Sequence, residues 1–85
     1  MIWDKEARDK FEAILAKIPI FLRPTAEKKV SRKAENLALA LGREAVSLKD
    51  VVDAFFSETP FGFHGPMKTD MQSEGIDYQK YGYEK

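Results

Sequence analysis

Residues 24–42 read PTAEKKVSRKAENLALALG, and this stretch sets the architecture of the chain. Pro24 suits the first position of a helix, where its missing amide donor costs nothing, and Gly42 suits the left-handed residue that follows a helix. Between them, apolar residues recur at helical spacing, and the small alanines allow a neighbouring helix to approach closely. We therefore predict a long central helix whose inward stripe consists of Ala26, Val30, Ala34, Leu37, Ala38 and Leu41.

A shorter helix is predicted on each side of the central one. Upstream, residues 4–18 carry apolar side chains at helical spacing after a candidate N-cap, Asp4, and this helix must end by Pro19. Downstream, Ser47 and Asp50 have the spacing of a capping box, and a third apolar stripe follows. These signals predict three helices in succession.

The length of the chain limits the size of its core. With 85 residues, of which 44% are hydrophobic and 33% are charged, the chain is typical of one small globular domain. A domain of this size buries only about 60% of the surface that its unfolded chain exposes, so its large side chains are needed inside. We expect the core to contain Trp3, Phe11, Phe21, Phe55 and Phe56.

The chain changes character from Pro60 onward. Glycine, proline and scattered charges replace the helical periodicity, although eight aromatic, histidine or methionine side chains remain that could pack back or bind a partner. We therefore predict an all-α fold: a compact three-helix domain over residues 1–57 and a polar, partly disordered C-terminal tail over residues 58–85. A chain that ends at Glu58 is then expected to keep its cooperative unfolding.

Composition excludes most catalytic and metal chemistry. Cysteine is absent, which removes disulfides, thiolate zinc sites, cysteine-ligated iron–sulfur clusters and a cysteine nucleophile. His64 is the only histidine, and a single imidazole makes a poor metal site. The serines lack a neighbouring base, and the carboxylate pairs lie on exposed helical faces. We expect no catalytic residue, no metal and no cofactor.

Charge and hydropathy give expectations about location. Fourteen basic residues balance fourteen acidic ones, so no overall field draws the protein to nucleic acid or to an anionic membrane. The N-terminus lacks the apolar run of a signal peptide, and no segment approaches the roughly 20 apolar residues that cross a bilayer. We expect a cytoplasmic protein that does not bind membranes.

An ordered set of short motifs gives the one specific functional lead. Residues 18–23, Ile-Pro-Ile-Phe-Leu-Arg, form an apolar elbow that ends in a basic residue, and Gly42 is followed after a short interval by Val46-Ser47. Together with Trp3 and the first helix, these pieces resemble the small C-terminal domain of the light-independent protochlorophyllide reductase B subunit, a family that also includes free-standing short proteins. The resemblance covers roughly residues 3–56.

That resemblance implies association with an oxidoreductase complex, and it implies no activity. In the reductase, the iron–sulfur ligands and the substrate-contacting residues belong to the large nitrogenase-like part of the subunit, which has no counterpart in this chain. The resemblance also does not extend to the segment beyond Phe56. The resemblance therefore implies a partner in an oxidoreductase complex and no catalytic residue in this chain.

A basic group on the central helix is the strongest polar feature. Helical spacing places its members on adjoining ridges, where they could bind a partner or phosphate, or could simply form the solvated side of the helix with Glu27 and Glu35. Arg23 stands apart, because it ends the elbow and could instead bond the carbonyls of a helix end. The candidate partner-binding residues are Arg23, Lys28, Lys29, Arg32 and Lys33.

These observations lead to one functional hypothesis and one alternative. The leading hypothesis is a non-catalytic accessory or protein-interaction module. The alternative is a nucleic-acid-binding, histone-like helical domain, because a long helix between two short ones with a basic ridge is similar to half of a histone fold. Residues 1–57 carry eleven Lys and Arg against nine Asp and Glu, so no substantial DNA or RNA binding is expected.

Overall fold

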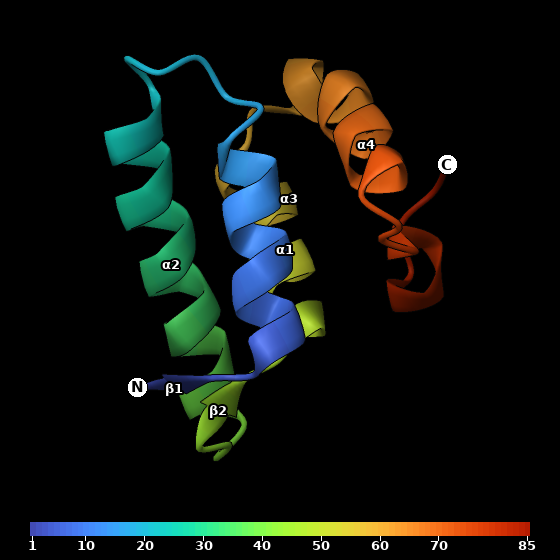
Figure 1. The fold of residues 1–85 in the computed structure, drawn as a ribbon. Coiled ribbons are helices and arrows are strands. Elements are labelled where there is room, and N and C mark those ends of the chain that lie inside the picture. Colours follow the sequence, from blue (N-terminus) through green and yellow to red (C-terminus); the bar gives the residue numbers. More distant parts are fainter.

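Three helices form the centre of the molecule, in the order that the sequence predicted. The computed structural model describes residues 1–85 and places α1 (Lys5–Leu15), α2 (Arg23–Ala40) and α3 (Leu48–Glu58) side by side (Figure 1). Val30, Ala34 and Ala38 of α2 are buried in one cluster with apolar side chains of α1 and α3. The prediction of a mostly helical fold is confirmed.

The helix ends explain where the chain turns. Pro24 lies in the first turn of α2, and Gly42 takes a left-handed conformation, with φ of 70°, just beyond its C-terminus. Ser47 and Asp50 form the predicted capping box at the start of α3. Asp4 precedes α1, but its side chain makes no capping hydrogen bond; its backbone amide donates to the Val46 carbonyl instead, at 2.9 Å.

A two-stranded parallel sheet, which the all-α prediction did not include, joins the N-terminus to the connection between α2 and α3. β1 (Ile2–Trp3) pairs with β2 (Ala45–Val46) in the register Ile2 to Ala45 and Trp3 to Val46. The indole Nε1 of Trp3 also donates to Glu35 on α2, at 2.9 Å. The N-terminus is therefore held against the connection between α2 and α3.

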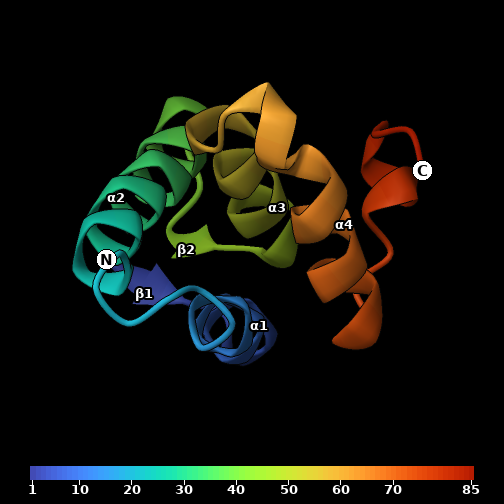
Figure 2. The same cartoon turned by 90° about the horizontal axis from the view of Figure 1, so that it is seen from above.

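The prediction of a polar, partly disordered tail over residues 58–85 was wrong. This segment forms a 3₁₀ helix η1 (Phe61–Phe63), the helix α4 (His64–Ser73) and a second 3₁₀ helix η2 (Tyr78–Tyr81). Seen from above, α3 lies between α2 and α4 (Figure 2). The segment contributes four buried side chains to the same core as the first three helices: Met67, Met71, Ile76 and Tyr78.

Polar and aromatic contacts fasten this C-terminal segment to α1 and α3. Lys10 donates to the Glu74 carbonyl, and the Glu74 carboxylate lies 3.4 Å from the Lys17 ammonium. The Tyr83 ring stacks on Phe56, with 3.8 Å between the ring centroids. The predicted boundary between residues 57 and 58 falls within the last turn of α3, and a single hydrophobic cluster contains residues from both sides of it.

The aromatic core differs from the predicted one at the elbow. Phe11, Phe55 and Phe56 are buried and Trp3 is half-buried, as expected, but Phe21 is 78% exposed. Leu41, predicted on the inward stripe of α2, is also exposed. The core is filled instead by Met67, Met71, Ile76 and Tyr78 of the C-terminal segment, so Phe21 is not needed to complete it.

Candidate functional site

Arg23 holds the elbow to the end of α1. Its Nε donates to the Ile18 carbonyl and its Nη2 to the Ala16 carbonyl, both at 2.7 Å. These carbonyls follow the last helical residue, where no backbone donor is available. Of the two roles considered for Arg23, the structure therefore shows the bonding of helix-end carbonyls, which fixes the direction of the elbow.

Three members of the predicted basic group gather on one face of α2. Lys28, Lys29 and Arg32 are exposed and line an open hollow together with Pro24 and Thr25. None of the three forms an ion pair within the chain. We call these three side chains the basic face.

The other expected members of the ridge lie elsewhere. Lys33 is half-buried and does not line the hollow of the basic face. Glu35 accepts from the Trp3 indole, and Glu27 lies beside Arg8 and Arg23 at a different hollow. Neither of these two carboxylates lines the hollow of the basic face or forms an ion pair with it.

A second hollow, largely apolar, adjoins the basic face. It has a volume of about 510 Å³ and is open to solvent. Its walls come from the elbow, the first turns of α2 and the connection from α3 to η1, which meet at the upper end of the molecule in Figure 1. The lining residues of this elbow hollow are Ile18, Pro19, Leu22, Thr25, Ala26, Lys29, Glu58, Thr59, Pro60 and Phe63.

Large apolar side chains are exposed in both segments that wall the elbow hollow. Ile20 and Phe21 are exposed in the elbow, and Phe61 and Phe63 are exposed in η1, with Phe61 89% accessible. Lys29 lines the elbow hollow and the hollow of the basic face, so the apolar and basic surfaces are continuous. The sequence showed the apolar elbow and the aromatic residues of the tail, but their meeting depends on the tertiary fold.

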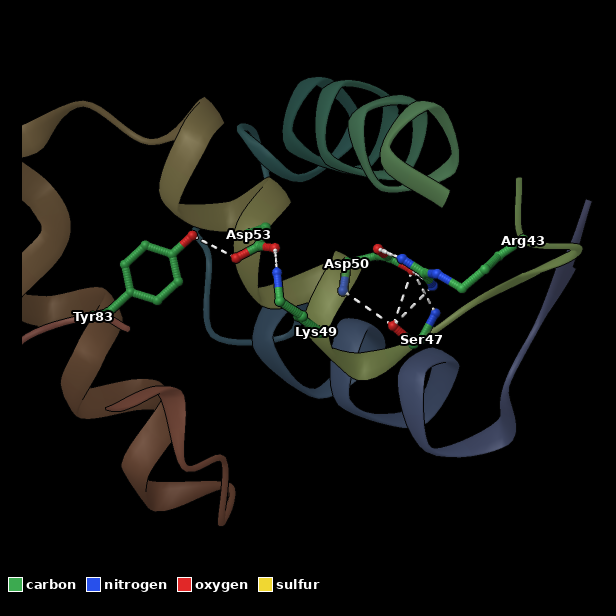
Figure 3. Close-up of polar contacts among 6 residues, drawn as sticks. All are labelled: Arg43, Ser47, Lys49, Asp50, Asp53 and Tyr83. Atoms are coloured by element: carbon green, nitrogen blue, oxygen red, sulfur yellow. Dashed lines mark hydrogen bonds and ion pairs between the residues drawn. The ribbon is translucent and has the colours of Figure 1, made fainter. Parts of the chain in front are cut away.

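The most buried polar side chain, Asp50, is fully hydrogen-bonded within the chain. The Arg43 guanidinium makes two hydrogen bonds of 2.5 Å to the Asp50 carboxylate, which also accepts from the Ser47 amide at 2.8 Å (Figure 3). Burial alone would raise the pKa of Asp50, which is 2% exposed, but the bonds from Arg43 and Ser47 outweigh burial and hold this pKa below its usual value. An ionised, fully bonded carboxylate at a helix N-terminus stabilises α3 and is not available as a general acid.

A second polar network lies one turn further along α3. The Tyr83 hydroxyl donates to Asp53 at 2.6 Å, and Lys49 contacts the other oxygen of that carboxylate, also at 2.6 Å (Figure 3). Burial and the hydrogen bond to Asp53 both raise the pKa of the Tyr83 phenol, so the neutral form is favoured. This network joins the end of the chain to α3.

The remaining candidates for chemistry are also structural. The His64 Nε2 lies 2.9 Å from the Thr59 carbonyl, and the ring packs edge-on against Phe56. No group of three or more histidine or carboxylate side chains is placed to hold a metal ion. None of the helices is both long and apolar enough to span a bilayer.

The chain is a small helical domain whose buried polar groups are bonded within the fold. Its most distinctive surface is the elbow hollow with the basic face beside it. The chain belongs to the family described as "Protein of unknown function (DUF2621)", whose model matches residues 1–84. This match includes the C-terminal segment as well as the first three helices. No curated protein and no solved structure matches the chain.

Proposed function

We propose that the protein is a non-catalytic interaction module that binds a partner protein through the elbow hollow. The observation that carries this proposal is the meeting of exposed apolar side chains from two distant segments, the elbow and η1, around one hollow. Contiguous exposed apolar surface on a small protein marks an interaction site far more often than scattered apolar residues do. The core is complete without these side chains, so packing within the chain does not explain them.

The sequence resemblance supports a particular kind of partner. The elbow, residues 18–23, is one of the motifs that resemble the small domain of the protochlorophyllide reductase B subunit, and it also forms one wall of the hollow. We therefore propose that the partner belongs to an oxidoreductase complex of the nitrogenase-like kind. The partner would supply the chemistry, and this chain would act as a cytoplasmic accessory subunit.

Site-specific crosslinking tests whether a protein binds at the elbow. A photo-reactive phenylalanine analogue replaces Phe21 in the elbow or, in the control, the exposed Leu39 near the other end of α2. In cells that make the protein, position 21 should give a discrete adduct that position 39 does not give. Adding Leu22→Asp to the first variant should remove that adduct. Equal adducts from both positions, or none from position 21, would contradict the proposal.

Nucleic-acid binding is the second candidate, and the basic face is the observation that favours it. Lys28, Lys29 and Arg32 are exposed and unpaired, so they could contact phosphates. Such binding would release counterions and weaken steeply with salt. Fluorescence anisotropy with random duplex and single-stranded oligonucleotides, repeated with the Lys28→Ala/Arg32→Ala variant, distinguishes the candidates. Salt-sensitive binding that this variant abolishes would favour the histone-like alternative.

A further inference from the structure

We infer that the segment which docks in the elbow hollow is an acidic amphipathic helix of the partner protein. This inference rests on the proposed function and specifies the chemistry of its partner. It follows from the apolar lining of the hollow, from its open shape and from the distribution of charge along its edges.

The apolar lining requires an occupant with several apolar side chains in a row. The hollow of about 510 Å³ is of the size that ligand sites have, roughly 300–1,000 Å³, but such sites enclose most of their ligand. This hollow is open, and Phe21 and Phe61, the chain neighbours of its lining residues Leu22 and Pro60, are exposed. A helix that presents apolar residues at i, i+3, i+4 and i+7 covers a surface of this kind, because its anchors fill the hollow and its flanks cover the rim.

The charges at the edge of the hollow determine which helix fits. Lys29 lies on the α2 side, with Lys28 and Arg32 beside it, and none of these cations has a carboxylate partner within the chain. Glu58 is the only acidic residue in the lining. A helix with acidic residues along one flank would pair with the basic face while its apolar residues enter the hollow. Such complementarity increases the association rate and selects the orientation of the bound helix.

Two other occupants fit these observations less well. An anionic membrane would match the basic face, but a concave surface with Glu58 on its lining does not insert into lipid as a convex apolar tip does. A second copy of the chain would have to offer an acidic helical face. The carboxylates of α1, Glu6 and Asp9, share their surface with Lys5 and Lys10, so that face is mixed in charge.

Peptide binding to the full chain tests the inference. The probe is a helical peptide of about 18 residues with leucines at i, i+3, i+4 and i+7 and glutamates along one flank. A matched peptide has lysines in place of the glutamates. The chain variants are Leu22→Ala in the hollow and Lys29→Glu at its basic edge, with Leu39→Ala and Lys80→Glu as matched exposed controls distant from it. A thermal melt of each variant verifies that it is folded.

The acidic peptide should bind, and the lysine peptide should bind at least about tenfold more weakly, a difference of about 1.4 kcal/mol. Leu22→Ala and Lys29→Glu should each weaken binding of the acidic peptide by a similar factor, and the two control variants should not. Equal binding of both peptides, or binding of neither, would overturn the inference. So would Lys29-dependent binding to anionic vesicles without peptide binding, or self-association that Leu22→Ala removes. If crosslinking from position 21 still captures a protein, the proposed function stands and only the acidic helix is rejected.

Discussion

The elbow and helix α4 carry similar side chains but differ in exposure. The elbow exposes Ile20, Phe21 and Leu22 to solvent, whereas α4 buries Met67 and Met71 in the core. Composition does not distinguish the two segments, because both are short and contain proline and large apolar residues. The difference shows that an apolar residue marks a binding surface only when the core is complete without it.

Removing the C-terminal segment tests this difference most severely. A chain that ends at Glu58 lacks four buried side chains and leaves Phe56 without its stacking partner, Tyr83. A small domain has a free energy of unfolding of only about 5–15 kcal/mol, and loss of a single large buried side chain removes about 2–5 kcal/mol of it. We expect the truncated chain to lose its cooperative thermal transition, contrary to the expectation from sequence. A calorimetric transition near that of the full chain would mean that the first three helices are self-sufficient.

A single substitution in α4 should have a smaller but still large effect. Met71 has no exposed surface, and Met71→Ala leaves a cavity between α4 and the helical core. We expect a loss of about 2–5 kcal/mol in the free energy of unfolding, measured by denaturant titration. The control is Leu41→Ala, which removes an exposed side chain and should change stability by less than about 0.5 kcal/mol. Similar losses in the two variants would show that α4 is not part of the core.

The hydrogen bond from the Tyr83 hydroxyl to Asp53 on α3 should make a modest, pH-dependent contribution to the free energy of unfolding. Tyr83→Phe keeps the stacking on Phe56 and removes the hydrogen bond to Asp53, so we expect a loss of about 1 kcal/mol. Folding raises the pKa of this phenol. The stabilisation from the phenol is therefore fully present below about pH 10, which is near its pKa in the unfolded chain, and is lost as the pH rises further. Unfolding titrations from neutral to alkaline pH should therefore show a steeper decline for the native chain than for the variant. Parallel declines would mean that Tyr83 is not bonded to Asp53 in solution.

Phe21→Ala should have the smallest effect on stability. The side chain is largely exposed, so we expect the free energy of unfolding to change by less than about 0.5 kcal/mol. The same denaturant titration provides the measurement, with Phe11→Ala as the buried phenylalanine control. A loss as large as that of Phe11→Ala would place Phe21 in the core and remove one edge of the proposed docking surface.

Local signals in the sequence predicted the first three helices, because each has its own start or stop. The capping box of Ser47 and Asp50 and the position of Pro24 are examples, since a few neighbouring residues specify them. Helix α4 was missed because Gly65 and Pro66 are typical of a loop. Pro66 lies in the first turn of α4, where proline is tolerated, and the two buried methionines form too short a stripe to reveal a helix.

The candidate site was predictable only in pieces. The basic residues of α2 and the apolar elbow were visible in the sequence, and three of the five predicted cations do share one face. Glu35 was named with the solvated side of this helix, but it accepts a hydrogen bond from the indole of Trp3, 32 residues away in the chain. The approach of η1 to the elbow likewise depends on how α4 returns to the core. Such contacts between distant segments are set by packing of the whole chain, which local patterns do not encode.

Amide hydrogen exchange of the full chain compares the elbow with α4 in a single measurement. If α4 belongs to the core, its amides around Met71, and the Ile76 amide that bonds the Met71 carbonyl, should exchange only through global unfolding, with the same protection as α3. The amides of Ile20 and Phe21, in the exposed elbow, should exchange at close to unprotected rates. Rapid exchange throughout residues 64–76, or strong protection of the elbow, would contradict the assignment of α4 to the core and of the elbow to the docking surface.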